Sequence, residues 1–525
     1  MSHRKHHKSK KKSLGKLRVH WETVSTVGSL APSGREGLTS DVVNGSVYTF
    51  GGLENGRRVS NLMSFDLTNH RWLSQKDRQA LMAGGDIGSG VTEVGNRNPE
   101  NPEQIDRGET EPESVPCSPP APRCYHDSWV VGHRLLCFGG EGSTSNVEKE
   151  TRDGFKNSEV FDEPATQRRT RRVCFDDVGL YNTIDHTWET VKSGLAPLPR
   201  KGHSCTMVGN DADAQVVVFA GEPSGKGMAM NDTHCVSVGS LLEGVAMWEK
   251  QRPLGDIPSP RHGHTAVSLV DGSKKADQPY LVVFGGTGGG GLLFNDVYTF
   301  GLVTKEWEIV ICDGISPPPR YGHTAAMIPK RQRHAKGSSG VQYKSGGRDP
   351  LMVVFGGVTR NGSELTFCRD MQILNITTKN WSEIRTTHLY PSPRYGHAMV
   401  VLENTFEAEL AVEDGHSKKE DPYTSSNTIH VCKLLIFGGL NQRYCSNEIW
   451  SAEIQMMKDG RETWGDGFDD EQPPAWATGG DASSSRKKGR SSVSGEEFET
   501  VNRELMKERK GEYSKAKERH VNGAL

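Results

Sequence analysis

Short apolar segments that end in small residues recur along the chain. Two examples are residues 216–219 and 281–284, each followed directly by Ala-Gly or Gly-Gly. The segments consist mainly of β-branched and aromatic residues and have no polar positions, as expected for strands that are buried on both faces. The pattern therefore predicts a protein built from many short β-strands joined by tight turns.

Each apolar segment belongs to a longer repeat that has four marks in a fixed order. An arginine precedes the first strand, glycines end the second, an Asn-Asp or related pair marks the third, and a tryptophan lies in the fourth. The arginines are Arg35, Arg123, Arg200, Arg261, Arg320 and Arg394. The glycines are Gly51, Gly52, Gly139, Gly140, Gly221, Gly285, Gly286, Gly356, Gly357, Gly438 and Gly439, and the tryptophans are Trp72, Trp188, Trp248, Trp307 and Trp381.

Two units depart from the repeat directly after the arginine. Four units continue with any residue and then Gly-His, whereas the first reads Arg35-Glu36-Gly37-Leu38 and the second reads Arg123-Cys124-Tyr125-His126.

The chain also has an early strand with no preceding strand to pair with. Residues 20–24 read His-Trp-Glu-Thr-Val and resemble residues 187–191, which end a complete unit. Trp21 lies 14 residues before Arg35, close to the 12 or 13 residues found in four other units. Trp464 is the rival, but it lies in a Gly- and Asp-rich stretch. We therefore expect the strand around Trp21 to complete the last sheet and close a ring.

With six units in register, the chain resembles the kelch-repeat proteins over residues 17–455. The resemblance implies an all-β fold, a six-bladed β-propeller closed by the N-terminal strand. Four-stranded blades stack into a ring because one blade cannot bury its faces alone. The glycines would allow backbones to approach closely, and the tryptophans would pack between blades.

The remaining segments are expected to be insertions and flexible tails. Polar insertions interrupt the propeller at residues 76–118, 141–172, 327–350 and 403–430, and their composition favours disorder. Residues 1–16 form a basic tail. Residues 456–525 form a largely disordered tail of mixed charge with one candidate helix at 494–519, which a Ser-x-x-Glu pattern opens.

Composition narrows the cellular setting. The net charge is −2, although residues 1–18 carry eight Lys and Arg and no carboxylate. The basic tail predicts a nuclear-localisation signal, a contact with an anionic surface or nucleic acid, or only a solubilising arm. No secretory leader or membrane span is apparent. The ten cysteines lack metal-site spacing and are expected to be reduced thiols, which predicts a cytoplasmic or nuclear location. A monomer is expected.

The repeat arginines are the candidate binding residues. The resemblance places Arg35, Arg123, Arg200, Arg261, Arg320 and Arg394 near the central channel, where arginines of some kelch proteins contact acidic peptides. Guanidinium groups suit such partners because they pair with carboxylates through two hydrogen bonds. A second interpretation stays open, in which each arginine bonds to the backbone of its own blade and holds the turn.

The sequence favours a non-catalytic scaffold or adaptor over an enzyme. It has no phosphate-binding loop, nucleophile elbow or zinc-binding helix motif, and it predicts no catalytic residues, metal ligands or cofactors. The expected partner is another protein, held at one propeller face by an arginine-lined pocket and loops. The alternative is an enzyme of the related galactose-oxidase-like fold that acts on a small molecule in the central pocket.

Overall fold

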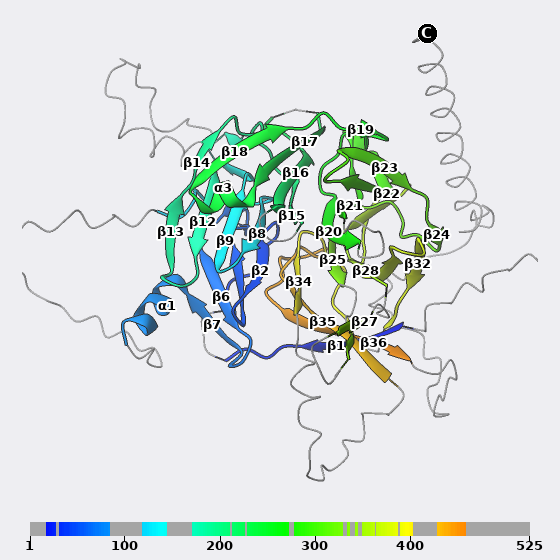
Figure 1. The fold of residues 1–525 in the computed structure, drawn as a ribbon. Coiled ribbons are helices and arrows are strands. Elements are labelled where there is room, and N and C mark those ends of the chain that lie inside the picture. The colour runs from blue at the N-terminus through cyan, green and yellow to red at the C-terminus, as the bar shows by residue number, and fades with distance from the viewer. Residues whose placement is uncertain are drawn as a thin grey trace, which may run out of the picture. The chain divides into compact units, whose positions relative to one another are not determined.

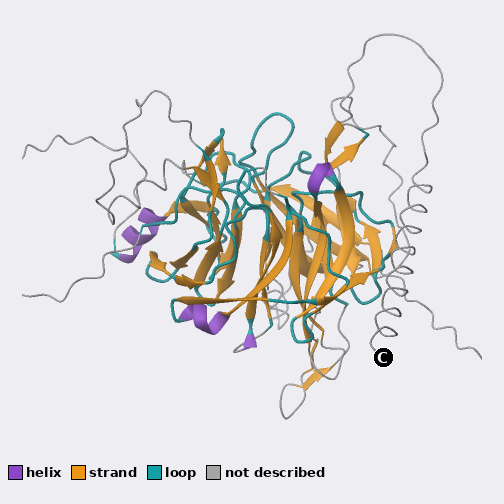
Figure 2. Cartoon of the chain, turned by 90° about the horizontal axis from the view of Figure 1, so that it is seen from above, coloured by secondary structure: helices purple, strands orange, loops and turns teal. Residues whose placement is uncertain are grey.

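The computed structural model describes the repeat units in detail. The described residues are 17–27, 31–84, 118–143, 171–209, 213–225, 228–271, 278–328, 333–335, 342–344, 349–362, 364–386, 389–402 and 428–457. Six antiparallel sheets surround a central axis as the blades of a propeller (Figure 1). Figure 2 shows that strands form almost all of the regular structure and that the short helices lie at its periphery.

Each blade runs from an inner strand to an outer strand. Blade 1 contains β2 (Thr39–Val43), β3 (Ser46–Phe50), β6 (Leu62–Asp66) and β7 (Arg71–Ser74), and blade 2 contains β8 (Asp127–Val131), β9 (Arg134–Phe138), β12 (Val178–Asn182) and β13 (Thr187–Thr190). Blade 3 contains β15 (Ser204–Val208), β16 (Gln215–Gly221), β17 (Met230–Ser237) and β18 (Val245–Lys250). Blade 4 contains β20 (Thr265–Asp271), β21 (Gln278–Thr287), β22 (Leu293–Gly301) and β23 (Glu306–Val310).

The last two blades complete the ring. Blade 5 contains β25 (Thr324–Ile328), β28 (Leu351–Phe355), β31 (Met371–Asn375) and β32 (Asn380–Glu383). Blade 6 contains β34 (Ala398–Leu402), β35 (Thr428–Phe437), β36 (Ile449–Met457) and, as its fourth strand, β1 (Leu17–Thr23). The pairing of β1 with β36 is antiparallel and extends from Leu17 opposite Met456 to Thr23 opposite Trp450. The predicted closure by the N-terminal strand is therefore confirmed.

The repeated tryptophans pack between blades. Each contacts the phenylalanine that ends the second strand of the preceding blade, with ring centroids 4.6–5.9 Å apart. The pairs are Trp21 with Phe355, Trp72 with Phe437, Trp188 with Phe50, Trp248 with Phe138, Trp307 with Phe219, and Trp381 with Phe284. The six contacts form a closed circle through the apolar core, as the repeat predicted.

Short added strands extend five blades outward. After leaving one blade, the chain pairs in parallel with the outer strand of the next. The added strands are β14 (Lys192–Gly194) on β18, β19 (Leu254–Gly255) on β23, β24 (Asp313–Gly314) on β32, and β33 (Arg385–Thr386) on β1. A single bridge from Val27 to Arg71 has the same place on blade 1.

The insertions contain regular structure that the sequence analysis did not predict. Helix α1 (Gln75–Met82) begins the 76–118 insertion, with Ser74 and Asp77 forming a capping box. Two strands, β26 (Arg333–Ala335) and β27 (Gln342–Lys344), pair as a hairpin inside the 327–350 insertion. Two smaller elements are α3 (Val238–Leu242) and the 3₁₀ turn Gly289–Gly291. Three further strand pairs are β4 (Leu53–Glu54) with β5 (Arg57–Arg58), β10 (Glu141–Ser143) with β11 (Arg172–Cys174), and β29 (Val358–Asn361) with β30 (Glu364–Phe367). The predicted tails, the helix at 494–519 and most of the insertion residues lie outside the described residues.

Replacing Trp21 with alanine tests the closure. We expect Trp21→Ala to lower the free energy of unfolding by about 3–5 kcal/mol, because it leaves a cavity between blades 5 and 6. Denaturant titration followed by circular dichroism measures the loss. The matched control is His20→Ala on the same strand, whose exposed side chain predicts a change within about 0.5 kcal/mol. Equal stability of Trp21→Ala and the wild type would contradict this role of the strand.

Candidate functional site

The six repeat arginines are buried inside their own blades. Arg123, Arg200, Arg261, Arg320 and Arg394 are 0% exposed, and Arg35 is 3% exposed. Each Nε–H donates to the carbonyl two residues earlier, and each Nη1 donates to the carbonyl of the first small residue that ends the second strand. Every arginine is therefore tied to the backbone at two places in the same blade.

An acidic or amide side chain from the third strand or the residues just before it completes each arginine site. Arg261 makes a bidentate pair with Asp296, at 2.6 Å and 3.0 Å. The other partners are Asn61 for Arg35, Asp177 for Arg123, Asp232 for Arg200, Asp370 for Arg320 and Glu448 for Arg394. With all these bonds formed, the guanidinium groups do not face the channel. The geometry favours the interpretation in which each arginine holds its own blade.

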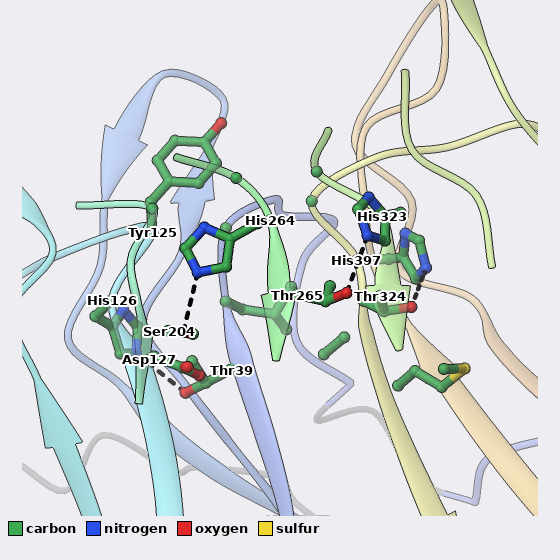
Figure 3. Close-up of a pocket in the computed structure, with 18 of the residues that line it drawn as sticks. Thr39, Tyr125, His126, Asp127, Ser204, His264, Thr265, His323, Thr324 and His397 are labelled. Carbon is green, nitrogen blue, oxygen red and sulfur yellow. Dashed lines mark hydrogen bonds between the residues drawn. The ribbon is translucent and has the colours of Figure 1, made fainter. Parts of the chain in front are cut away.

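A central channel runs between the inner strands. Its cavity of about 230 Å³ is lined by residues of β2, β8, β15, β20, β25 and β34 and by the turns that precede them. Figure 3 shows that histidines and hydroxyl side chains surround it. The lining is thus made from the residues that directly follow the repeat arginines.

Histidine–hydroxyl hydrogen bonds connect neighbouring blades around this channel (Figure 3). The pairs are His126 with Thr39 at 3.0 Å, His264 with Ser204 at 3.0 Å, His323 with Thr265 at 2.9 Å, and His397 with Thr324 at 2.7 Å. Burial, with the nearby arginine charges, lowers the pKa of these histidines; that of His397 falls to about 3. At neutral pH these histidines are uncharged, and their lowered pKa values make them unsuited to act as general bases.

Two junctions break this pattern. Between blades 6 and 1 both partners are apolar, because Leu38 stands in the histidine position and Ala398 in the hydroxyl position. Between blades 2 and 3 the hydroxyl is replaced by Asp127, which accepts from the Cys205 N–H at 2.6 Å and the Ser128 N–H at 2.9 Å.

The pKa of the Asp127 carboxyl is unusually high. Burial, aided by the charge of Asp41 and opposed by the two backbone hydrogen bonds, raises its pKa to about 7. Burial also raises the pKa of Asp41 to about 6, although the Ser128 hydroxyl donates to it. Asp127, which lines the channel, and Asp41 behind it therefore form a carboxyl pair that gains charge between mildly acidic and neutral pH.

Six backbone hydrogen bonds form a closed ring at one end of the channel. The second residue after each arginine donates its N–H to the carbonyl of its counterpart in the preceding blade, over 2.7–2.9 Å. The members are Gly37, Tyr125, Gly202, Gly263, Gly322 and Gly396, all with φ between 55° and 63°. Only glycine adopts this left-handed conformation without strain, so Tyr125 is the costly exception.

The side chain of Tyr125 lies at the mouth of the channel and extends away from His126 (Figure 3). The Tyr395 hydroxyl is hydrogen-bonded to Tyr125 and to the Glu36 carboxylate. Glu36 is 6% exposed, and its Oε2 has no hydrogen-bond partner among the described residues. Tyr321 packs beside Tyr395, with ring centroids 6.3 Å apart. We call Glu36, Tyr125, Tyr321 and Tyr395 the tyrosine–glutamate cluster.

A second cluster, of charged residues, joins blades 1, 2 and 3 around Glu141. Glu141 lies between Arg58 and Lys201, whose Nζ is 2.5 Å away, with the Arg172 Nε at 4.0 Å. Burial alone would raise the pKa of Glu141, but the hydrogen bonds from Lys201 and Arg58 lower it. Lys201 and His262 also lie 4.0 Å and 3.8 Å from Glu222. The charged residues of this second cluster pair with one another, whereas the Glu36 Oε2 of the tyrosine–glutamate cluster has no hydrogen-bond partner among the described residues.

The described cysteines are not activated as nucleophiles. All nine described cysteines are free thiols, and seven of them are buried. Burial raises the pKa of Cys235 to about 11 and of Cys124 and Cys137 to about 12, so these thiols stay protonated. Among the residues that the structure describes, no group of three His, Cys, Asp or Glu side chains has metal-site geometry, and no helix is long and apolar enough to cross a membrane.

The sequence analysis noted the departure at Tyr125 but assigned no role to it or to Glu36. The signal at Tyr125 was available, since this residue replaces the repeat glycine at a position next to the channel. The proximity of Glu36 and Tyr125 to Tyr321 and Tyr395 depends on ring closure, which places blades 1, 2, 5 and 6 around one mouth. Only the folded structure shows this proximity.

Removing one repeat arginine tests its structural role. We expect Arg261→Ala to lower the free energy of unfolding by about 3–5 kcal/mol, because Asp296 is then left buried without its partner. Urea titration of the full chain measures this loss. The matched control, Arg252→Ala, removes an exposed guanidinium and should change stability by no more than about 0.5 kcal/mol. An unchanged Arg261→Ala protein would show that the pair does not hold the blade.

The Asp127 carboxyl predicts a pH-dependent stability. An unfolded Asp ionises near pH 3.9, whereas folded Asp127 ionises near pH 7, so wild-type stability falls as the pH rises between these values. Asp127→Asn should therefore be more stable than the wild type by about 1–2 kcal/mol at pH 8, with no such gain at pH 4. Urea titrations at both pH values measure it, with exposed Glu243→Gln as control. A pH-independent difference would contradict the raised pKa.

Two family models match the chain. The KLHDC2/KLHL20/DRC7 Kelch-repeats domain matches residues 166–335, and the Kelch motif matches residues 34–77. The two matched segments lie in different parts of the propeller, blade 1 and the central blades.

Curated proteins are similar over longer stretches. Acyl-CoA-binding domain-containing protein 4 of Arabidopsis thaliana is 24% identical over 431 residues, which is 82% of this chain and 46% of that protein. Host cell factor 1 of Homo sapiens is 29% identical over 295 residues, 53% of this chain and 12% of that protein. The chain thus spans less than half the length of these relatives. The Kelch family models and the six closed blades confirm the kelch-repeat β-propeller that the sequence predicted.

Proposed function

We propose that this protein is a non-catalytic interaction module that holds a segment of a partner protein at the mouth of its central channel. A protein-binding role fits the kelch propeller and its relatives. The observation that carries the specific proposal is Tyr125, a bulky residue kept in a left-handed conformation at a ring position where the other five blades have glycine. Strained residues that persist in a stable scaffold are concentrated at functional sites.

The chemistry of the mouth favours a basic side chain of the partner. The Glu36 carboxylate has an oxygen without a hydrogen-bond partner among the described residues, and three tyrosines surround it. An arginine or lysine would supply the missing donor and would pack against the aromatic rings. This replaces the acidic partner expected from the sequence, since the repeat arginines are occupied within their blades.

The enzyme alternative finds no support in the described residues. The channel histidines have lowered pKa values, and the buried thiols have raised ones, so neither group matches the needs of a base or nucleophile near neutral pH. The basic tail at 1–16, the cytoplasmic or nuclear location and the monomeric state remain predictions from the sequence.

Variants of the tyrosine–glutamate cluster test the proposal. Partner proteins are captured on immobilised full-length chain and quantified by mass spectrometry for the wild type, Glu36→Gln and Tyr125→Gly. We expect at least a tenfold loss of the specific partner for Glu36→Gln, because the charge pair is lost. Tyr125→Gly should lose the partner while its stability stays within about 1 kcal/mol, since relief of backbone strain offsets the lost ring contacts.

The control is Val303→Asp, an exposed residue of the β22–β23 turn on the opposite face of the propeller. It should retain every partner that the wild type captures. Equal capture by the wild type and both cluster variants, with all proteins folded by circular dichroism, would show that this mouth is not the binding site.

A further inference from the structure

The hairpin formed by β29 and β30 lies beside the tyrosine–glutamate cluster. At its base, Val358 pairs with Phe367 and exchanges two backbone hydrogen bonds with Tyr321, over 2.9 Å and 3.1 Å. The Phe367 ring contacts the Tyr395 ring, with centroids 5.6 Å apart. The hairpin therefore contacts two tyrosines of the cluster from the blade 5 side of the channel.

One face of this hairpin combines apolar side chains with an arginine. Directly opposed residues of an antiparallel pair lie on the same face, and faces alternate along each strand. The opposed residues Arg360 and Leu365 therefore share a face with Phe367, two residues along β30 from Leu365. The Leu365 side chain is 50% exposed. This face thus presents an accessible apolar surface and a positive charge next to the cluster.

Arg360 lies against a glycine turn of the neighbouring blade 4. Residues 288–291 are four consecutive glycines, and a Cβ at Gly291 would lie only 2.9 Å from Nη2 of Arg360. The absence of side chains in the turn leaves room for the guanidinium. Arg360 is itself exposed and forms no ion pair with a described residue. Leu292, directly after the glycines, is 57% exposed and adds to the apolar surface.

Opposite charges therefore lie on the two sides of the tyrosines. The Glu36 carboxylate of blade 1 is hydrogen-bonded to Tyr395. The Arg360 charge of blade 5 acts on Tyr321, because it opposes the rise that burial causes in the pKa of that tyrosine. A chain segment that crosses this surface meets a negative group on one side and a positive group on the other, with aromatic and aliphatic side chains between them.

We propose that the partner segment held at the mouth carries a basic and an acidic residue with an apolar residue between them. The basic side chain would lie at Glu36, the apolar one against Leu365 and Phe367, and the acidic one at Arg360. A segment with two charges of the same sign would bring like charges together at one end, which selects against it. This inference rests on the proposed function, to which it adds the acidic and apolar requirements.

A random peptide library tests the charge pattern. Nonapeptides of random sequence, displayed on their encoding RNA, are selected on the immobilised full-length wild type and on Arg360→Glu, and the enriched sequences are compared. On the wild type we expect peptides that carry Lys or Arg and Asp or Glu on the two sides of an apolar residue. Arg360→Glu should lower the enrichment of acidic residues about fivefold or more and keep that of basic residues, because its carboxylate repels an acidic side chain.

Two further variants separate this inference from the proposed function. Glu36→Gln should lose the basic residues and keep the acidic ones. Arg252→Glu, the same charge change at an exposed arginine two residues beyond β18, is the matched control and should select as the wild type does.

The inference is overturned, and the proposed function stands, if Arg360→Glu selects the same peptides as the wild type while Glu36→Gln does not. An equal loss of acidic residues with Arg252→Glu also overturns it, since overall charge would then be the cause. If Glu36→Gln and Arg360→Glu, both folded by circular dichroism, select as the wild type does, or if the wild type enriches no charge pattern, the inference and the proposed function are both overturned.

Discussion

The buried guanidinium of each repeat arginine is the interaction on which the propeller depends. It bonds to two carbonyls of its own blade and to a side chain at the third strand. The carbonyl of the same arginine accepts a hydrogen bond from the N–H of the second small residue that ends the second strand of the preceding blade, as from Gly221 to Arg261 at 2.9 Å. One residue therefore fixes the interior of a blade and its junction with the next. Removing water from an ion pair is costly, so the full set of bonds is needed to offset that cost.

Much of this architecture was predictable because each unit repeats its own local chemistry. Closure by Trp21 followed from the spacing between tryptophan and arginine, since a blade lacking its fourth strand leaves an edge that only a distant strand can fill. For the arginines the sequence left two interpretations open, and the geometry favours the one in which each arginine holds its own blade. The Asn-Asp marks were interpreted as strand signals alone, although Asp232 and Asp296 of these marks are partners of repeat arginines. A charge pair across two strands looks, in sequence, like two separate marks.

The hairpins and α1 escaped prediction for a different reason. They are short, and their stability comes from contacts with the propeller that no local pattern reveals. Arg78, for example, donates from α1 to Ser64 at 2.9 Å and to Ser46 at 2.7 Å in blade 1. The helix is thus held by polar contacts to strands of blade 1, whereas composition indicated only a polar insertion.

A ring of equal units cannot distinguish one direction of approach from another, so recognition must come from the units that differ. Blade 1 contributes Glu36, blade 2 contributes Tyr125, and closure through β1 places blade 6 with Tyr395 beside both. These differences involve neighbouring blades, whereas the repeat arginines and tryptophans are present throughout. If they were neutral drift in a tolerant scaffold, the left-handed Tyr125 would be the least expected of them, because reversion to glycine removes strain of about 1–2 kcal/mol. Its retention is best explained by a use for its side chain.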